Sequence, residues 1–165
     1  MKVAIIMGSD SDFPVVQKGY NLLKDFGVDV NVKVLSAHRT PDKAINFAKN
    51  AEVNGYEVII GAAGKAAHLP GVLAGCTVLP VIGLPIKSSE LDGLDALLSI
   101  VQMPPGVPVA TVAINGAENA ALLAVQILSV KYEVLRNRLK EYKELMAEKV
   151  FEKNKKLNDK LNGGI

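Results

Sequence analysis

The sequence of 165 residues has one cysteine, no tryptophan and no long apolar run. With Cys76 alone, a disulfide within the chain and a two-cysteine metal clamp are both excluded, and a reducing compartment is indicated. A membrane-spanning helix needs about 20 consecutive apolar residues, and the start MKVAIIM is too short even for a secretory signal. We therefore expect a cytoplasmic protein that does not enter a membrane.

An excess of charge of one sign is also missing. The chain has 19 Lys and Arg against 17 Asp and Glu, a formal net charge of +2, and its lysines concentrate in the C-terminal quarter. A balance of this kind does not predict a nucleic-acid partner. Hydrophobic residues make up 49% of the chain and aromatic residues 5%, which is enough to bury one core of small aliphatic side chains.

Short β-branched runs alternate with helical patterns over residues 1–130. Strands are predicted at 3–7, 28–35, 57–61, 79–85 and 107–114, and a helical pattern follows each of them. Asp12 with Pro14, and Thr40 with Pro41, mark the starts of the first two helices. This alternation predicts an α/β protein, a flavodoxin-like three-layer α/β/α sandwich with a five-stranded parallel sheet in the order 2-1-3-4-5.

From residue 131 the pattern changes to one long charged helix. Its apolar residues recur at spacings of three and four, and they are Leu135, Leu139, Tyr142, Met146 and Val150, with Leu157 and Leu161 further on. Because a helix this long cannot lie wholly on a small sheet, we expect residues 131–162 to be an oligomerisation arm of the same structural unit. A solvated helix that packs only at its root is the alternative.

Polar side chains gather in three segments that follow predicted strands: GSDSD (8–12), SAHRT (36–40) and AAGKAAH (62–68). In an open parallel sheet, ligands bind beyond the carboxyl ends of the strands, where the winding direction reverses. With the predicted order, this point lies between the first and third strands, with the second strand alongside. The three segments are therefore predicted to form one site.

The segment GSDSD places serine hydroxyls and free amides at a helix start, which favours a monophosphate with a sugar. It is neither a Walker loop nor a GxGxxG fingerprint, and its two aspartates would repel a polyphosphate. Ordinary helix capping by Ser9, Ser11 or Asp12 is the alternative. Arg39 offers a fork for an anionic group, or else it is a solvated surface arginine.

The only two histidines, His38 and His68, each follow an alanine near the end of a predicted strand. Histidine is the side chain whose ordinary pKa suits proton transfer at neutral pH. No His-x-His or HExxH spacing predicts a metal, and no GxSxG motif predicts a serine hydrolase. Gly61, Gly64 and Gly71 either let the backbone approach a planar ligand or allow tight packing.

Six motifs, in order over about residues 3–130, together resemble one enzyme family: MGSDSD, SAHRTP, AAHLPG, LPVIGLP, LDGLDALLSIVQMPPGVPVATVAI and ENAALLAVQIL. The chain closely resembles the class I 5-(carboxyamino)imidazole ribonucleotide mutases of de novo purine biosynthesis. This resemblance implies a flavodoxin-like fold, a nucleotide substrate, and a homo-octamer with sites where subunits meet. It implies no metal and no organic cofactor.

Carried over by motif, the resemblance implies that Ser9, Ser11, Asp12 and Arg39 bind the ribose and phosphate, and that His38 is the proton carrier. It also implies that His68 is catalytic and that a substrate and carbon dioxide pocket is formed by Gly8, Ser36, Ala37, Gly64, Lys65, Ala66, Ala67 and Leu69. Many relatives have glycine-glycine or glycine-leucine where this chain has Gly64-Lys65. Lys65 either helps to hold a carboxylate or points to solvent.

Two other functions are open at this point. A class II carboxylase would fix free carbon dioxide on the unsubstituted aminoimidazole nucleotide, but the arginine of SAHRTP and the AAHLPG segment favour class I. A flavodoxin-like module that binds flavin or a nucleotide without chemistry would need aromatic side chains around the ring, and the three segments have no tryptophan or tyrosine.

Overall fold

Five parallel strands form the centre of the computed structural model, which describes residues 1–162. The strands are β1 (Lys2–Met7), β2 (Asp29–Val34), β3 (Val58–Gly64), β4 (Val81–Ile86) and β5 (Ala110–Thr111). They lie in the order β2-β1-β3-β4-β5, and every neighbouring pair is parallel. The predicted strand order is confirmed, and the winding direction reverses between β1 and β3.

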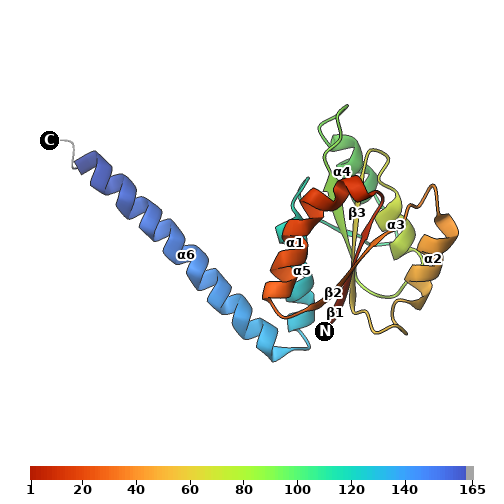
Figure 1. The fold of residues 1–165 in the computed structure, drawn as a ribbon, viewed down its shortest axis with the longest axis horizontal. Coiled ribbons are helices and arrows are strands. Elements are labelled where there is room, and N and C mark those ends of the chain that lie inside the picture. Colours follow the sequence, from red (N-terminus) through yellow and green to blue (C-terminus); the bar gives the residue numbers. More distant parts are fainter. Residues whose placement is uncertain (163–165) are drawn as a thin grey trace.

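Helices cover both faces of this sheet, as the flavodoxin-like prediction requires (Figure 1). One face carries α1 (Phe13–Asp25) and α5 (Ala117–Ser129), and the other carries α2 (Pro41–Asn50), α3 (Leu69–Ala74) and α4 (Leu94–Val101). A short 3-10 turn, η1 (Asp10–Asp12), leads from β1 into α1. The last helix, α6 (Glu133–Asn162), leaves the body of the molecule.

The alternation of side chains along β1 divides the apolar core into two clusters. Val3, Ile5 and Met7 point toward α1 and α5, whereas Ala4 and Ile6 point toward α2 and α3. All five are at most 4% exposed. Full burial of a large aliphatic side chain contributes about 1.5–3 kcal/mol to folding, so the apolar run of β1 holds both layers of helices to the sheet.

The helix boundaries follow the predicted signals, with one correction at Thr40. Gly27 ends α1 with a positive φ of 75°, as a glycine can without strain. Thr40 precedes Pro41 as predicted, but its hydroxyl bonds back to the amide and carbonyl of Ser36 instead of capping α2. Within α1, Tyr20 is half-buried, whereas Gly19 is buried against α5.

The fifth strand is much shorter than the predicted 107–114. Only Ala110 and Thr111 pair with β4, followed by two further bonds, from the Val112 amide to the Gly83 carbonyl and from the Asn115 amide to the Pro85 carbonyl. The proline at 108 has no N–H to donate, and at 115 an asparagine with a φ of 57° turns the chain. These two residues limit the edge strand from either side.

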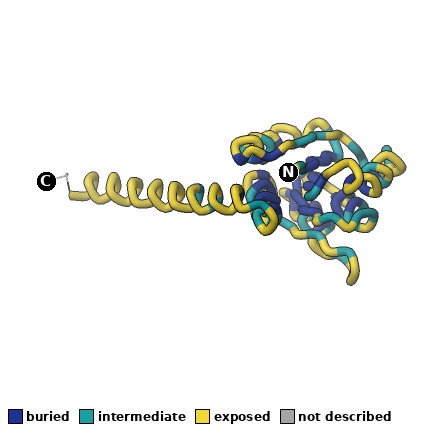
Figure 2. Tube along the Cα trace, turned by 90° about the horizontal axis from the view of Figure 1, so that it is seen from below, coloured by how far each residue is buried: buried dark blue, intermediate teal, exposed yellow. Residues whose placement is uncertain are grey.

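Helix α6 packs on the body only at its root. Leu135 is fully buried, and Lys131 and Tyr132 both contact the Glu57 carboxylate at 2.8 Å, which fixes the point where the helix departs. Farther along, the predicted stripe is exposed, from 51% at Met146 to 70% at Leu161 (Figure 2).

Cys76 is half-buried against the core cluster on the α2 side of the sheet. Among residues 1–162, no helix is both long and apolar enough to cross a membrane.

Candidate active site

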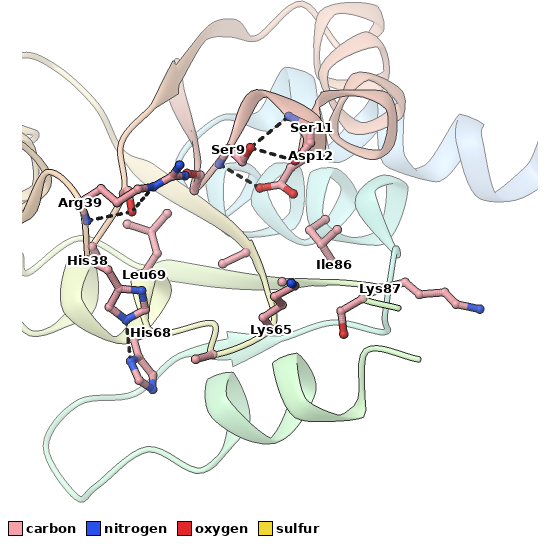
Figure 3. A pocket seen from close by; sticks show the side chains of 17 residues that line it. Ser9, Ser11, Asp12, His38, Arg39, Lys65, His68, Leu69, Ile86 and Lys87 are labelled. Carbon is pink, nitrogen blue, oxygen red and sulfur yellow. Dashed lines mark hydrogen bonds between the residues drawn. The ribbon is translucent and has the colours of Figure 1, made fainter. Parts of the chain in front are cut away.

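A cavity of about 560 Å³ lies at the carboxyl edge of the sheet, where the loops after β1, β2, β3 and β4 meet. Its lining residues are Gly8, Ser9, Ser11, Asp12, Ser36, Ala37, His38, Arg39, Ala63, Gly64, Lys65, Ala66, His68, Leu69, Ile86, Lys87 and Ser88. Figure 3 shows the side chains around this cavity. Every predicted site residue except Ala67 lies here, so the three polar segments do converge.

The differences from the sequence prediction are small and local. Ala67 is fully buried and packs into the core on the α2 side, because the chain turns inward after the exposed Ala66. Ile86, Lys87 and Ser88 line the cavity but were not predicted. They follow β4, the neighbour of β3, and their place directly after a predicted strand was the signal that could have identified them.

The loop after β1 caps itself. The Ser9 hydroxyl accepts a hydrogen bond from the Ser11 amide at 3.3 Å, and the Ser9 amide donates to Asp12 Oδ2 at 3.1 Å. Helix capping by Ser9 and Asp12, the alternative given for this segment, is therefore present in the chain without a ligand. The Ser11 hydroxyl also donates to Ser9 Oγ at 2.8 Å, and the Ser9 hydroxyl donates to Asp10 Oδ1 at 3.2 Å. Both hydroxyls lie on the cavity wall, so a ligand that binds them would replace these internal partners (Figure 3).

Asp12 is the one buried charged residue within the described part of the chain, at 8% exposure. Burial raises the pKa of its carboxyl above the ordinary value of 3.8, while the Ser9 amide opposes this rise. The charge of Asp10 raises the pKa of Asp12 further, and Arg39 lowers it. The ionised form of Asp12 is therefore destabilised in the site unless a further hydrogen-bond donor contacts it.

This environment predicts the behaviour of Asp12→Asn. Because the pKa of Asp12 is raised on folding, the ionised carboxyl opposes folding above pH 3.8 and has no such effect once both states are protonated. We expect Asp12→Asn to show a Tm at pH 7 equal to or above that of the wild type, and this difference to vanish near about pH 3. Thermal unfolding followed by circular dichroism measures both values.

A matched variant, Asp159→Asn, removes an exposed carboxylate of α6 and should leave the Tm unchanged. A clear loss of stability in Asp12→Asn at pH 7 would show instead that the hydrogen bond from Ser9 outweighs the cost of burial.

Arg39 joins two of the loops. Its Nη2 donates to the Gly8 carbonyl at 2.9 Å, and its backbone amide donates to Ser36 Oγ at 3.1 Å. A guanidinium has five N–H donors, so these contacts leave donors free on the cavity wall. The arginine is exposed and yet held in place, which differs from a freely solvated side chain.

The two histidines form a pair. His38 Nε2 lies 2.9 Å from His68 Nδ1, and the rings meet edge to face with an interplanar angle of 81°. Between two neutral imidazoles, one nitrogen of this contact must donate and the other accept. If His38 donates, its Nδ1 is a base; if His68 donates, the proton of His38 is on Nδ1, which is then an acid. His38 therefore switches from base to acid when its Nδ1 takes up a proton, its Nε2 proton passes to His68 Nδ1, and His68 Nε2 releases a proton.

The glycines have different tasks. A Cβ on Gly61 would lie 3.1 Å from Pro70 Cα, and one on Gly71 would lie 2.9 Å from the Met103 sulfur, so both glycines serve packing around α3. Gly64 lines the cavity and backs onto the Ile86 carbonyl, 3.2 Å from where its Cβ would be. Close approach to a ligand is therefore open to Gly64 alone among the three.

These features define a class. One cavity at the switch point of a parallel sheet is lined by hydroxyls, by a guanidinium fixed through a hydrogen bond, and by a hydrogen-bonded histidine pair. This arrangement is typical of a flavodoxin-like enzyme that performs acid–base chemistry on a small ligand. Within residues 1–162, no three His, Cys, Asp or Glu side chains are grouped so that they could hold a metal ion.

Comparison with known proteins identifies the family. The AIR carboxylase family model matches residues 2–149, and the chain belongs to this family. It is 63% identical over 145 residues to the N5-carboxyaminoimidazole ribonucleotide mutase of Pyrococcus abyssi, covering 88% of this chain and 83% of the relative. It is 58% identical over 156 residues to the mutase of that name from Thermotoga maritima, covering 94% and 91%.

A solved structure supports the same assignment. The crystal structure of Treponema denticola PurE superposes with a TM-score of 0.87 at 32% identity, covering 94% of this chain and 98% of that one. The flavodoxin-like fold predicted from the sequence is therefore confirmed both by the strand order and by a related protein.

Proposed function

We propose that this protein is an N5-carboxyaminoimidazole ribonucleotide mutase, which converts its substrate into 4-carboxy-5-aminoimidazole ribonucleotide in purine biosynthesis. Relatives with this activity in their names are 51–63% identical to the chain over most of its length. The observation that supports the chemistry is the contact between His38 and His68 inside the cavity that also holds Ser9 and Arg39.

The nucleotide would enter with its phosphate and ribose toward the loop after β1. The hydroxyls of Ser9 and Ser11 and the free donors of Arg39 suit a phosphate, and the Asp12 carboxylate suits a ribose hydroxyl, which would supply the donor it lacks. The cavity volume of about 560 Å³ lies within the usual range for a nucleotide-sized ligand.

The reaction then needs one proton in each direction. His38 gives a proton to the carbamate nitrogen as the N–C bond breaks, and carbon dioxide departs while the bonding pair remains on nitrogen. The electron-rich ring carbon forms a C–C bond to the carbon dioxide, and His38 removes the ring proton to restore aromaticity. The proton spent in the first step returns in the last, so the histidine pair ends as it began.

Carbon dioxide must be retained between these steps, since its escape would leave a net decarboxylation. Small residues of the loop after β3 form one side of the cavity, but Lys65, Ala66 and both histidines are exposed in the single chain. A neighbouring subunit would close this side. We therefore include a cytoplasmic homo-octamer, with sites at subunit contacts, in the proposal.

The activity is tested by incubating the purified chain with the carbamate nucleotide and following formation of the ring-carboxylated isomer without ATP. Conversion that does not depend on added bicarbonate supports a mutase. Activity only with the unsubstituted aminoimidazole nucleotide and bicarbonate would show a class II carboxylase instead, and absence of both reactions would contradict the proposal.

The proposed assembly makes a prediction for α6. We expect the double substitution Met146→Glu with Val150→Glu to split the oligomer, because it places two charges on the exposed apolar stripe. Size-exclusion chromatography with light scattering measures the mass. Lys155→Glu is the matched control: it changes the net charge equally but lies about 180° around the helix from Met146. An unchanged mass for the double variant would exclude the arm from the interface.

A further inference from the structure

We propose that Lys65 binds the carboxylate that this reaction transfers, and thereby sets the preference of this chain for carboxylated over uncarboxylated nucleotide. The inference rests on the proposed mutase function and assigns a role to a residue that the family motif does not include.

Lys65 is the cationic side chain of the cavity that has no ion-pair partner within residues 1–162. Three cationic side chains line it, and two of them have partners: Arg39 donates to the Gly8 carbonyl at 2.9 Å, and Lys87 Nζ lies 2.8 Å from Asp92. Over residues 1–162, Lys65 has neither an ion pair within 4.0 Å nor a hydrogen bond. Figure 3 shows its side chain reaching into the cavity, whereas that of Lys87 points away.

The backbone at this position is one that lysine does not prefer. Lys65 has a φ of 54°, in the left-handed region that glycine adopts without strain. A disfavoured conformation at a cavity wall is a reason to look for a function of the side chain that occupies it.

The position of Lys65 selects the carboxylate over the phosphate. Ser9, Ser11 and Arg39 provide the phosphate with hydroxyls and a guanidinium at the loops after β1 and β2. Lys65 is on the loop after β3, three residues before His68, where the histidine pair handles the proton. The substrate carries the carboxylate on the exocyclic nitrogen and the product carries it on the adjacent ring carbon, so one flexible ammonium can reach both.

One opposing charge near Lys65 is the carboxylate of Glu90. Glu90, on the loop after β4, is fully exposed, and its pKa is lowered by the Ser89 hydroxyl and by the charge of Lys65. Within residues 1–162, the Lys65 ammonium thus acts on the Glu90 carboxylate without forming an ion pair with it. Because it would bind the carboxylate in substrate and product alike, its removal should raise KM more than it lowers kcat.

Calorimetry with two nucleotides tests the proposal. We expect Lys65→Met to weaken binding of 4-carboxy-5-aminoimidazole ribonucleotide about tenfold, or about 1.4 kcal/mol. Binding of aminoimidazole ribonucleotide, which lacks the carboxylate, should stay within about twofold in bicarbonate-free buffer. Lys65→Arg keeps the charge and should retain the discrimination, and Lys33→Met, on the exposed side of β2 outside the cavity, should change neither affinity.

Each other outcome has a distinct meaning. Unchanged affinity for the carboxylated nucleotide in Lys65→Met overturns the inference while the mutase function stands. Equal weakening for both nucleotides also overturns it, because the ammonium would then contact the phosphate. A wild type that binds neither nucleotide and converts no substrate contradicts the proposed function itself. Lys65→Gly, which removes the charge and relieves the φ of 54°, should lose the discrimination without a lower Tm.

Discussion

Replacing His38 with asparagine is expected to lower kcat by about a hundred- to ten-thousand-fold, the usual contribution of a positioned acid–base group. An asparagine side chain keeps the approximate size of the ring and a hydrogen bond toward His68, but it cannot exchange a proton. Binding should change little, since His38 is separate from the hydroxyls and the guanidinium that suit the phosphate. Single-turnover conversion and a direct binding titration measure the two quantities separately.

His68→Asn serves as the companion variant. Its side chain can still contact His38 Nε2, but it cannot pass a proton along the pair, so we expect a loss of kcat smaller than that of His38→Asn. Full turnover by His38→Asn would reject the proton-carrier role. Loss of binding together with turnover would show that His38 serves mainly to shape the cavity.

Arg39→Met is expected to give the opposite kinetic pattern, with KM raised about a hundredfold and kcat nearly unchanged. A charge-assisted hydrogen bond contributes about 1.5–3 kcal/mol, and the guanidinium offers more than one to a phosphate. Arg39 also ties the loop after β2 to the Gly8 carbonyl, so its removal loosens the wall of the site. Initial rates over a range of substrate concentrations separate KM from kcat.

Arg39→Lys should not restore the wild-type KM, because an ammonium cannot hold Gly8 and a phosphate with the same planar fork. Lys18→Met, an exposed position on α1 outside the cavity, is the control for the loss of one positive charge. A wild-type KM in Arg39→Met would remove the arginine from substrate binding and leave it a structural tie between loops.

The convergence of the loops could be predicted because it follows from topology. Apolar runs identified the strands, and the parallel order 2-1-3-4-5 brings the segments after β1, β2 and β3 to one edge. The orientation of single residues within those segments could not be predicted. Ala66 is exposed and the adjacent Ala67 is buried, because of local backbone turns for which neither alanine gives a signal.

The same limit applies to the glycines of β3 and to α6. Gly61 and Gly64 point to opposite faces of the strand, so only register decides which of them reaches the cavity. The spacing of the apolar stripe predicted the long helix, but it did not predict that Leu135 is fully buried within the single chain. The spacing of apolar residues along one chain does not identify what covers the exposed part of the stripe.

The crowded backbone behind the cavity bears on how this enzyme can diverge. A Cβ on Gly64 would lie 3.2 Å from the Ile86 carbonyl oxygen of β4, and one on Gly61 would lie 3.1 Å from Pro70 Cα of α3, so a larger side chain at either position requires β4 or α3 to shift. Substitutions in the site are then accommodated more readily at exposed lining positions such as Lys65. In a laboratory library that seeks altered nucleotide preference, we expect more tolerated substitutions at such exposed positions than at Gly61 and Gly64.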